Sequence, residues 1–141
     1  MLTTWLKKCF MHKTFLFIGA LFGVLAVVLG AFAGHGLKKI VQPADLSTFQ
    51  TGVQYQVYHA LALLVTGILY EKFYNKWMRF AGFSFIIGIL LFSGSLYLLV
   101  LLKANSSVGI NGIGLITPFG GIFLILGWVF MLIGIAKRSP S

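Results

Sequence analysis

Charged residues are scarce in this sequence, and acidic residues are almost absent. Only 9% of the 141 residues are charged, and 2 Asp and Glu stand against 11 Lys and Arg. An average soluble protein has about 25% charged residues. A chain of this length cannot bury a hydrophobic content of 59% in a core surrounded by water. The composition therefore excludes a soluble globular domain and a disordered chain, and it indicates an integral membrane protein.

Groups that carry catalysis or hold cofactors are also missing. The single cysteine, Cys9, cannot form an intramolecular disulfide, and no Cys/His cluster surrounds it. Asp45 and Glu71 stand at the ends of apolar segments on opposite sides of the membrane, so they cannot act as an acid–base pair. No acid lies inside an apolar segment, which argues against a relay of protons or cations. We expect neither enzymatic activity nor a bound cofactor.

Long hydrophobic runs are what the sequence has in abundance. The charge-free segments are 14–37, 46–70, 80–102 and 104–136. A helix needs about 20 residues to cross the hydrocarbon core, so each segment is long enough for one span and none for two. The first run is longer than the apolar part of a secretory signal peptide, so we expect an uncleaved span there. The sequence predicts an all-α integral membrane four-helix bundle in a single domain. We place the spans at about 14–34, 53–70, 80–102 and 114–136, with a short interfacial helix at about 44–52 that runs into the second span.

The basic residues are distributed unevenly between the two sides of the membrane. Four spans put both termini on one side, and that side collects most of the positive charge. It holds Lys7, Lys8, Lys13, Lys72, Lys76, Arg79, Lys137 and Arg138, whereas the opposite side holds Lys38, Lys39 and Lys103. Because cytoplasmic loops carry the excess of Lys and Arg, we expect both termini to be cytoplasmic. Lipid headgroups at the span ends account for the net charge of +9, so we expect no nucleic-acid partner.

Small residues recur at helical spacing in the predicted spans. Lipid tails are as apolar as leucine, so membrane helices associate where small residues allow a close approach. In the first span such residues follow a 4-3-4-3 spacing, and in the fourth they recur every seven residues. The predicted packing positions are Gly19, Gly23, Gly30, Gly88, Gly120, Gly127 and Gly134.

Polar side chains gather at one depth, in the half of the bilayer away from the termini. At a rise of 1.5 Å per residue, the polar positions of all four spans fall in that half. The cluster consists of His35, Gln54, Tyr55, Gln56, His59, Ser93, Ser95 and Thr117. Such residues form either hydrogen bonds between helices or a pocket for a ligand or lipid headgroup. His35 and His59 as a metal or haem pair are a weaker alternative, because no carboxylate or Cys accompanies them.

Several motifs resemble the YgdD-type family of small bacterial inner-membrane proteins. They are Gly30-Ala31-Phe32-Ala33-Gly34-His35-Gly36-Leu37, Thr51-Gly52-Val53-Gln54-Tyr55-Gln56-Val57-Tyr58-His59-Ala60-Leu61-Ala62-Leu63-Leu64, Leu91-Phe92-Ser93-Gly94-Ser95-Leu96-Tyr97, Ile116-Thr117-Pro118-Phe119-Gly120-Gly121 and Gly127-Trp128. The match covers all four predicted spans, with two departures. The family tends to read Gly-Ala-His-Gly where this chain has Ala33-Gly34-His35-Gly36, and the loop 103–112 is longer than is usual in the family. The resemblance implies a four-span protein of the bacterial inner membrane and brings no established activity or catalytic residues with it.

Together these patterns indicate a small multi-pass membrane protein that acts as a non-enzymatic binding or accessory component. Its expected partners are the lipid bilayer and either further copies of the chain or a larger membrane complex. The alternative is a minimal oligomeric transporter or channel for a small solute. A conduit needs polar residues that continue to the cytoplasmic side, and the sequence offers few there.

Overall fold

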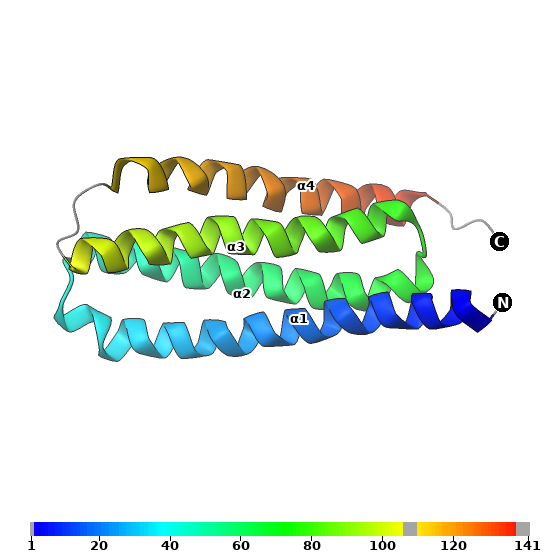
Figure 1. The fold of residues 1–141 in the computed structure, drawn as a ribbon, viewed down its shortest axis with the longest axis horizontal. Coiled ribbons are helices and arrows are strands. Elements are labelled where there is room, and N and C mark those ends of the chain that lie inside the picture. Colours follow the sequence, from blue (N-terminus) through cyan, green and yellow to red (C-terminus); the bar gives the residue numbers. More distant parts are fainter. Residues whose placement is uncertain (1, 106–109, 138–141) are drawn as a thin grey trace.

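The computed structural model consists of four long helices that run side by side (Figure 1). It describes the backbone of residues 2–105 and 110–137 and the side chains of residues 13–105 and 112–137. Of the basic residues counted above, Arg138 lies outside the described residues, as do the side chains of Lys7 and Lys8. The long helices are α1 (Leu2–His35), α2 (Pro43–Lys72), α3 (Lys76–Ala104) and α4 (Ile116–Ala136), and the 3-10 helices η1 (Leu37–Lys39) and η2 (Ile110–Leu115) precede α2 and α4.

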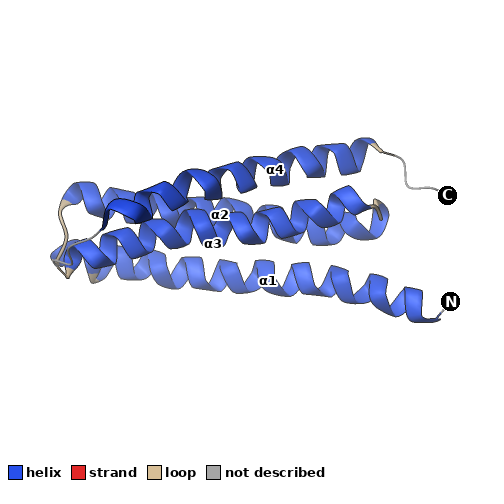
Figure 2. Ribbon diagram, turned by 45° about the horizontal axis from the view of Figure 1, so that its top comes forward, coloured by secondary structure: helices blue, strands red, loops and turns tan. Residues whose placement is uncertain are grey.

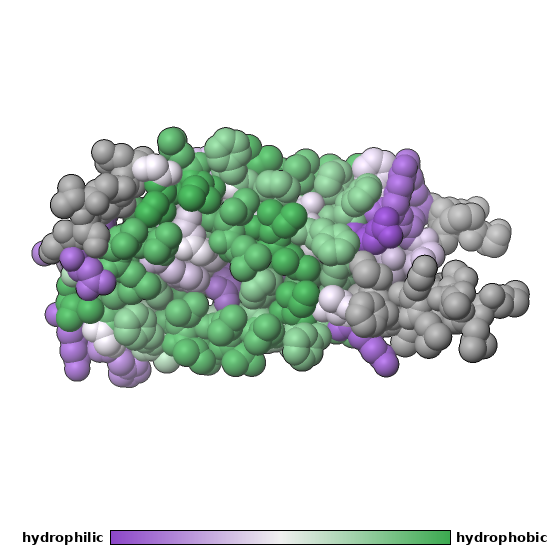
Figure 3. Space-filling model, in the orientation of Figure 1, coloured by the Kyte–Doolittle hydropathy of each residue, from purple (hydrophilic) through white to green (hydrophobic). Residues whose placement is uncertain are grey.

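All four long helices are long and apolar enough to cross a membrane. In the described part of the chain, Figure 2 shows helices joined by short loops and no strand. The all-α membrane class predicted from the charge-free segments is therefore confirmed. Large hydrophobic side chains such as Phe17, Val27 and Leu132 are exposed on the outside of the bundle, where a bilayer rather than water would contact them. In Figure 3, hydrophobic surface covers the middle of the molecule and hydrophilic residues gather at both ends.

The α2 helix is continuous from Pro43 to Lys72, so the predicted segments 44–52 and 53–70 form one helix. Pro43 lies in the first turn, where its missing N–H leaves no bond unmade, and Asp45 in the same turn complements the helix dipole. The α3 helix begins at Lys76, because the Asn75 side chain caps it by accepting a hydrogen bond from the Met78 amide at 3.1 Å. The same side chain donates to the Gly134 carbonyl at 2.8 Å and so ties α3 to α4.

The helices pack in chain order, α1 on α2, α2 on α3 and α3 on α4. Figures 1 and 2 show α2 and α3 between the two outer helices. The start of α1 and the end of α4 lie at one end of the molecule, which we call the terminal end, and η1 and η2 lie at the other, the distal end (Figure 1). The main core fills the bundle with Phe15, Leu63, Met78 and Phe85, and a second core under η1 contains Leu37, Phe49 and Val100.

Glycines set the close approach of α3 to α4. A Cβ atom on Gly120 would lie 2.3 Å from the backbone nitrogen of Phe92. On Gly88 and Gly127 it would lie 2.4 Å from Leu124 and 2.5 Å from Phe85, respectively. Gly134, one heptad further, would meet the Met78 backbone nitrogen at 3.1 Å. The spacing of seven residues in the fourth span therefore marks a real contact face.

The α1 helix departs from the predicted glycine stripe. A Cβ atom on Gly19 would lie 2.9 Å from Leu64, and one on Gly30 would make only an ordinary contact of 3.5 Å with Val53. The prediction that Gly23 is a packing position is wrong, because a Cβ atom there would meet nothing within 4 Å. The buried face of α1 is centred on Phe22 and Ala26, which puts Gly23 at its edge. Three further glycines that lie at close helix contacts were not predicted from the sequence, namely Gly52, Gly67 and Gly82.

Candidate functional site

Gln56 lies at the centre of the polar cluster and joins three helices. Its side chain is buried, with 3% of its surface exposed. The Nε2 atom donates to the Phe22 carbonyl on α1 at 2.8 Å, and the Oε1 atom accepts from the Tyr97 hydroxyl on α3 at 2.8 Å. Both ends of the carboxamide are thus bonded within the chain, so the group is satisfied without a ligand.

A second bond joins α2 to α3 beside Gln56. The Ser93 hydroxyl donates to the Gly52 carbonyl at 2.7 Å and is almost fully buried. A Cβ atom on Gly52 would lie 2.8 Å from the Tyr97 ring, so the absence of a side chain at Gly52 makes room for that ring. Tyr97 was not among the predicted site residues. The signal that could have found it is Gly52, which shares the polar face of the second span with His59.

Ser95 and Thr117 join α3 to α4 at a similar depth. Their hydroxyl oxygens are 2.7 Å apart. The Ser95 hydroxyl donates to the Phe92 carbonyl at 2.9 Å, so Thr117 is the donor in the bond between the two side chains. Gly120, one turn further along α4, packs directly on the Phe92 backbone. The hydroxyl pair therefore reinforces the close contact between α3 and α4.

His59 links α2 to α4 and uses both ring nitrogens. Its Nδ1 atom lies 2.7 Å from the Tyr55 carbonyl, which can only accept, so Nδ1 carries the proton. The indole N–H of Trp128 donates to Nε2 at 3.2 Å. These two bonds select the neutral tautomer protonated at Nδ1. The imidazole packs among the rings of Tyr55, Phe85 and Trp128 at centroid distances of 5.9, 5.8 and 6.2 Å.

The two histidines of the weaker metal or haem interpretation are not brought together. His35 is exposed at the end of α1, and its Nδ1 atom bonds to the Ala31 carbonyl of the same helix at 3.0 Å. His59 has no nitrogen left to bind a metal while its two bonds persist. Within the described residues, no group of three or more His, Cys, Asp or Glu side chains could hold a metal ion.

Gln54 and Tyr55 lie outside the buried network. Gln54 is exposed and donates from Nε2 to the hydroxyl of Tyr58, one turn away on the same helix, at 2.7 Å. The Tyr55 ring is 39% exposed and stacks on Phe92 at 4.6 Å. The predicted cluster therefore divides into buried residues and surface residues. The buried network is built on Gln56, His59, Ser93 and Ser95, which are buried, and on the half-buried Thr117. The half-buried Tyr97 and the Trp128 side chain, which is 47% exposed, join it and were not predicted from the sequence.

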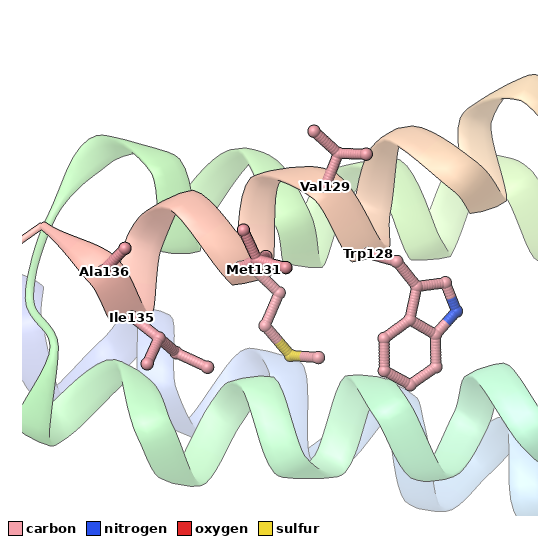
Figure 4. A pocket seen from close by; sticks show the side chains of 6 residues that line it. Trp128, Val129, Met131, Ile135 and Ala136 are labelled. Atoms are coloured by element: carbon pink, nitrogen blue, oxygen red, sulfur yellow. The ribbon is translucent and has the colours of Figure 1, made fainter.

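An apolar pocket of about 550 Å³ lies against the terminal half of α4. Its lining residues are Trp128, Val129, Met131, Leu132, Ile135 and Ala136. In Figure 4, Trp128, Met131 and Ile135 point from α4 towards the neighbouring helices, and Val129 points away. The lining offers dispersion contacts and almost no hydrogen bonding, so the pocket suits a hydrocarbon chain rather than a polar substrate.

The chain is similar to a family of membrane proteins across most of its length. The profile of a family described as "Protein of unknown function (DUF423)" matches residues 29–121. UPF0382 membrane protein YwdK of Bacillus subtilis is 40% identical over 126 residues, which are 89% of this chain and 98% of the relative. UPF0382 inner membrane protein YgdD of Escherichia coli is 34% identical over 119 residues, which are 84% of this chain and 86% of the relative. No solved structure matches the chain.

Proposed function

This chain belongs to the DUF423 family of membrane proteins, and from that premise and its internal polar contacts we propose that it is a non-enzymatic accessory component of the bacterial inner membrane. Its relatives are named UPF0382 membrane proteins, and the one from Escherichia coli is named an inner membrane protein. The protein is a multi-pass protein of that membrane, with four helices that can span it. The proposal concerns what the protein does there.

The observation that carries the proposal is that the buried polar groups, apart from the Ser84 hydroxyl, have hydrogen-bond partners within the described part of the chain. The groups best suited to chemistry are already bonded: both ends of Gln56, both nitrogens of His59 and the hydroxyl of Ser93. A catalytic base must be free to reach a substrate proton, and a pocket for a polar ligand must present unpaired donors or acceptors. The network has the properties of contacts that hold helices together. Its surface, rather than its interior, is then what meets partners.

We further propose that both termini face the cytoplasm, so that the distal end faces outward. The start of α1 and the end of α4 lie at the same end of the bundle (Figure 1). That end also carries Lys72, Lys76 and Arg79 around the connection between α2 and α3. The positive-inside tendency supports this orientation.

A transporter or channel would need a polar path through the terminal half as well. Of the side chains that the structure describes there, the buried polar ones are Thr66 and Ser84. The Thr66 hydroxyl donates to the Ala62 carbonyl of its own helix at 2.7 Å, which leaves it little capacity to bind a solute. Around them lie Leu63, Phe85 and Met131, which would exclude water. The described residues therefore form no continuous polar path across the terminal half, which favours the accessory role.

Reconstitution into vesicles tests the proposal. The purified protein is inserted into vesicles that contain a pH-sensitive dye, and gradients of protons, K⁺ and Cl⁻ are applied in turn. We expect the leak rate of protein-free vesicles, with gramicidin as the positive control for flux. A rate that rises with the amount of protein would contradict the proposal and favour the transporter. Native mass spectrometry of the same preparation is expected to give a mass above the 15.5 kDa monomer, from further copies or a partner.

A further inference from the structure

The lipid-facing side of α2 carries hydrogen-bonding side chains deep in the membrane. From Asp45 to Glu71, the charged residues at its two ends, α2 is about 39 Å long, which exceeds a hydrocarbon core of about 30 Å by roughly 5 Å at each end. Gln54 is about 14 Å from the level of Asp45, so it lies well inside the hydrocarbon. Asp45 itself pairs with Lys103 at 2.8 Å, which fixes the polar boundary at the distal end. Hydrophilic surface interrupts the distal half of the apolar band in Figure 3.

The polar groups on this side retain unused hydrogen-bonding capacity. Gln54 makes one bond, from Nε2 to the Tyr58 hydroxyl, and both side chains are exposed. Among the described residues, nothing pairs with the second N–H or the Oε1 atom of Gln54, or with the hydroxyl hydrogen of Tyr58. A lipid tail cannot supply these bonds, so a lone copy leaves them unmade in hydrocarbon.

The exposed residues of α2 also have the spacing of a helix–helix seam. Gln54, Tyr58, Leu61, Val65 and Ile68 follow one another at intervals of 4, 3, 4 and 3 residues. All five side chains are exposed, and Ile68 reaches 61%. Intervals of 4 and 3 place side chains on one stripe that faces a parallel partner helix. A polar side chain at one position of such a seam fixes the register of the two helices.

The depth and charge of the surface argue against a lipid headgroup as its partner. A phosphate would have to leave the interface for the hydrocarbon, and no Lys or Arg accompanies Gln54 at that depth. A second copy of the chain can supply the missing hydrogen bonds instead. Two copies inserted in the same orientation are related by a two-fold axis along the membrane normal, so each residue near the axis meets its own equivalent. A carboxamide carries both donors and an acceptor, and it can therefore pair with an identical carboxamide.

We propose that the protein forms a parallel homodimer through the α2 face of Gln54, Tyr58, Leu61, Val65 and Ile68, with the two Gln54 carboxamides hydrogen-bonded across the two-fold axis. This proposal rests on the accessory role proposed above and identifies a second copy of the chain as its first partner. The proposed function and the proposed dimer can be refuted independently, because a dimer that conducts ions would contradict the function and leave the interface intact.

Cysteine cross-linking in native membranes tests the interface. Cys9 is the only cysteine, so Cys9→Ser gives a background in which a single new cysteine reports one position. We expect Gln54→Cys and Leu61→Cys to form a disulfide-linked dimer on oxidation. Val28→Cys is the matched control, because Val28 is 58% exposed on α1 and lies near the same depth, between the contacts of Phe22 with Gln56 and of Gly30 with Val53. Equal cross-linking at Val28 and Gln54, or a Gln54→Cys adduct with a different protein, would overturn the dimer.

A second variant measures the carboxamide bond without disturbing the fold. Among the described residues Gln54 bonds to no other helix, so Gln54→Leu should leave the monomer folded. We expect it to raise the dimer dissociation constant in detergent about three- to twenty-fold, as the loss of interhelical hydrogen bonds does. Gln54→Asn, which keeps the carboxamide, should weaken the dimer less. Dissociation constants that are equal for wild type and Gln54→Leu would refute the pairing of the carboxamides.

Discussion

Individual polar residues in this protein could be assigned a depth from the sequence but not a direction. Gln54 and Gln56 are two positions apart, yet Gln56 is buried between α1 and α3 and Gln54 faces outward. A helix turns about 100° per residue, so a shared depth does not give a shared face. The main partner of Gln56 on α1 is the Phe22 carbonyl, a backbone atom that no sequence pattern marks.

Two buried serines on α3 allow a hydrogen-bonded hydroxyl to be compared with an unpaired one. Both Ser93 and Ser84 are buried, but Ser93 donates to Gly52, whereas Ser84 has no hydrogen bond within the described part of the chain. We expect Ser93→Ala to lower the free energy of unfolding by about 0.6–1.7 kcal/mol. Ser84→Ala should leave it unchanged or raise it, because an unsatisfied buried hydroxyl is removed. Unfolding in mixed detergent micelles measures both, and equal losses would contradict the assignment.

Substitutions of His59 test whether this residue is a structural link between helices or part of a ligand site. His59→Ala removes two hydrogen bonds and a ring packed among three others, so we expect a loss of about 2–4 kcal/mol in the free energy of unfolding. His59→Gln keeps a donor and an acceptor and should recover part of that loss. Trp128→Phe removes the indole donor together with part of the ring that packs on His59 and Phe85, so it should cost at least about 0.6 kcal/mol. Bound lipid, analysed in the same preparations, should not change. Loss of a specific lipid in His59→Gln, with the fold intact, would show a site.

The four spans were predictable here because charged residues stand at the ends of the apolar segments. Lys13, Glu71, Arg79 and Lys103 bound these segments, and each segment contains most of one membrane-spanning helix, although α1 begins already at Leu2. The sequence did not show which helix faces contact one another. The period of seven in the fourth span correctly marked a contact face, whereas the glycine stripe of α1 included Gly23, where the bundle leaves open space. Larger side chains, Phe22 and Ala26, occupy the actual contact.

Glycine substitutions on two helices should therefore have opposite outcomes. Gly120→Ala places a Cβ atom 2.3 Å from the Phe92 backbone nitrogen, so α3 and α4 must separate. We expect a loss of about 1–3 kcal/mol in the free energy of unfolding, as overpacking usually causes. Gly23→Ala meets no atom within 4 Å and should be neutral or stabilising, because alanine favours the helix. If both variants lose the same stability, the close contact of α3 with α4 is wrong.

At the scale of the whole molecule, the firmest prediction concerns orientation in the membrane. Eight basic residues on one side and three on the other predict that both termini are cytoplasmic. The bundle places the start of α1 and the end of α4 at one end, and Asn105 follows α3 at the other (Figure 1). Alkaline phosphatase is active only outside the cytoplasm, and green fluorescent protein inserted by the general secretion route fluoresces only inside it. Fusions at Ser141 should therefore fluoresce without phosphatase activity, and insertions at Asn105 should give phosphatase activity without fluorescence. The same sign at both positions would contradict four spans. Reversed signs would keep the spans and invert the bundle, which would place the buried polar network in the cytoplasmic half of the membrane.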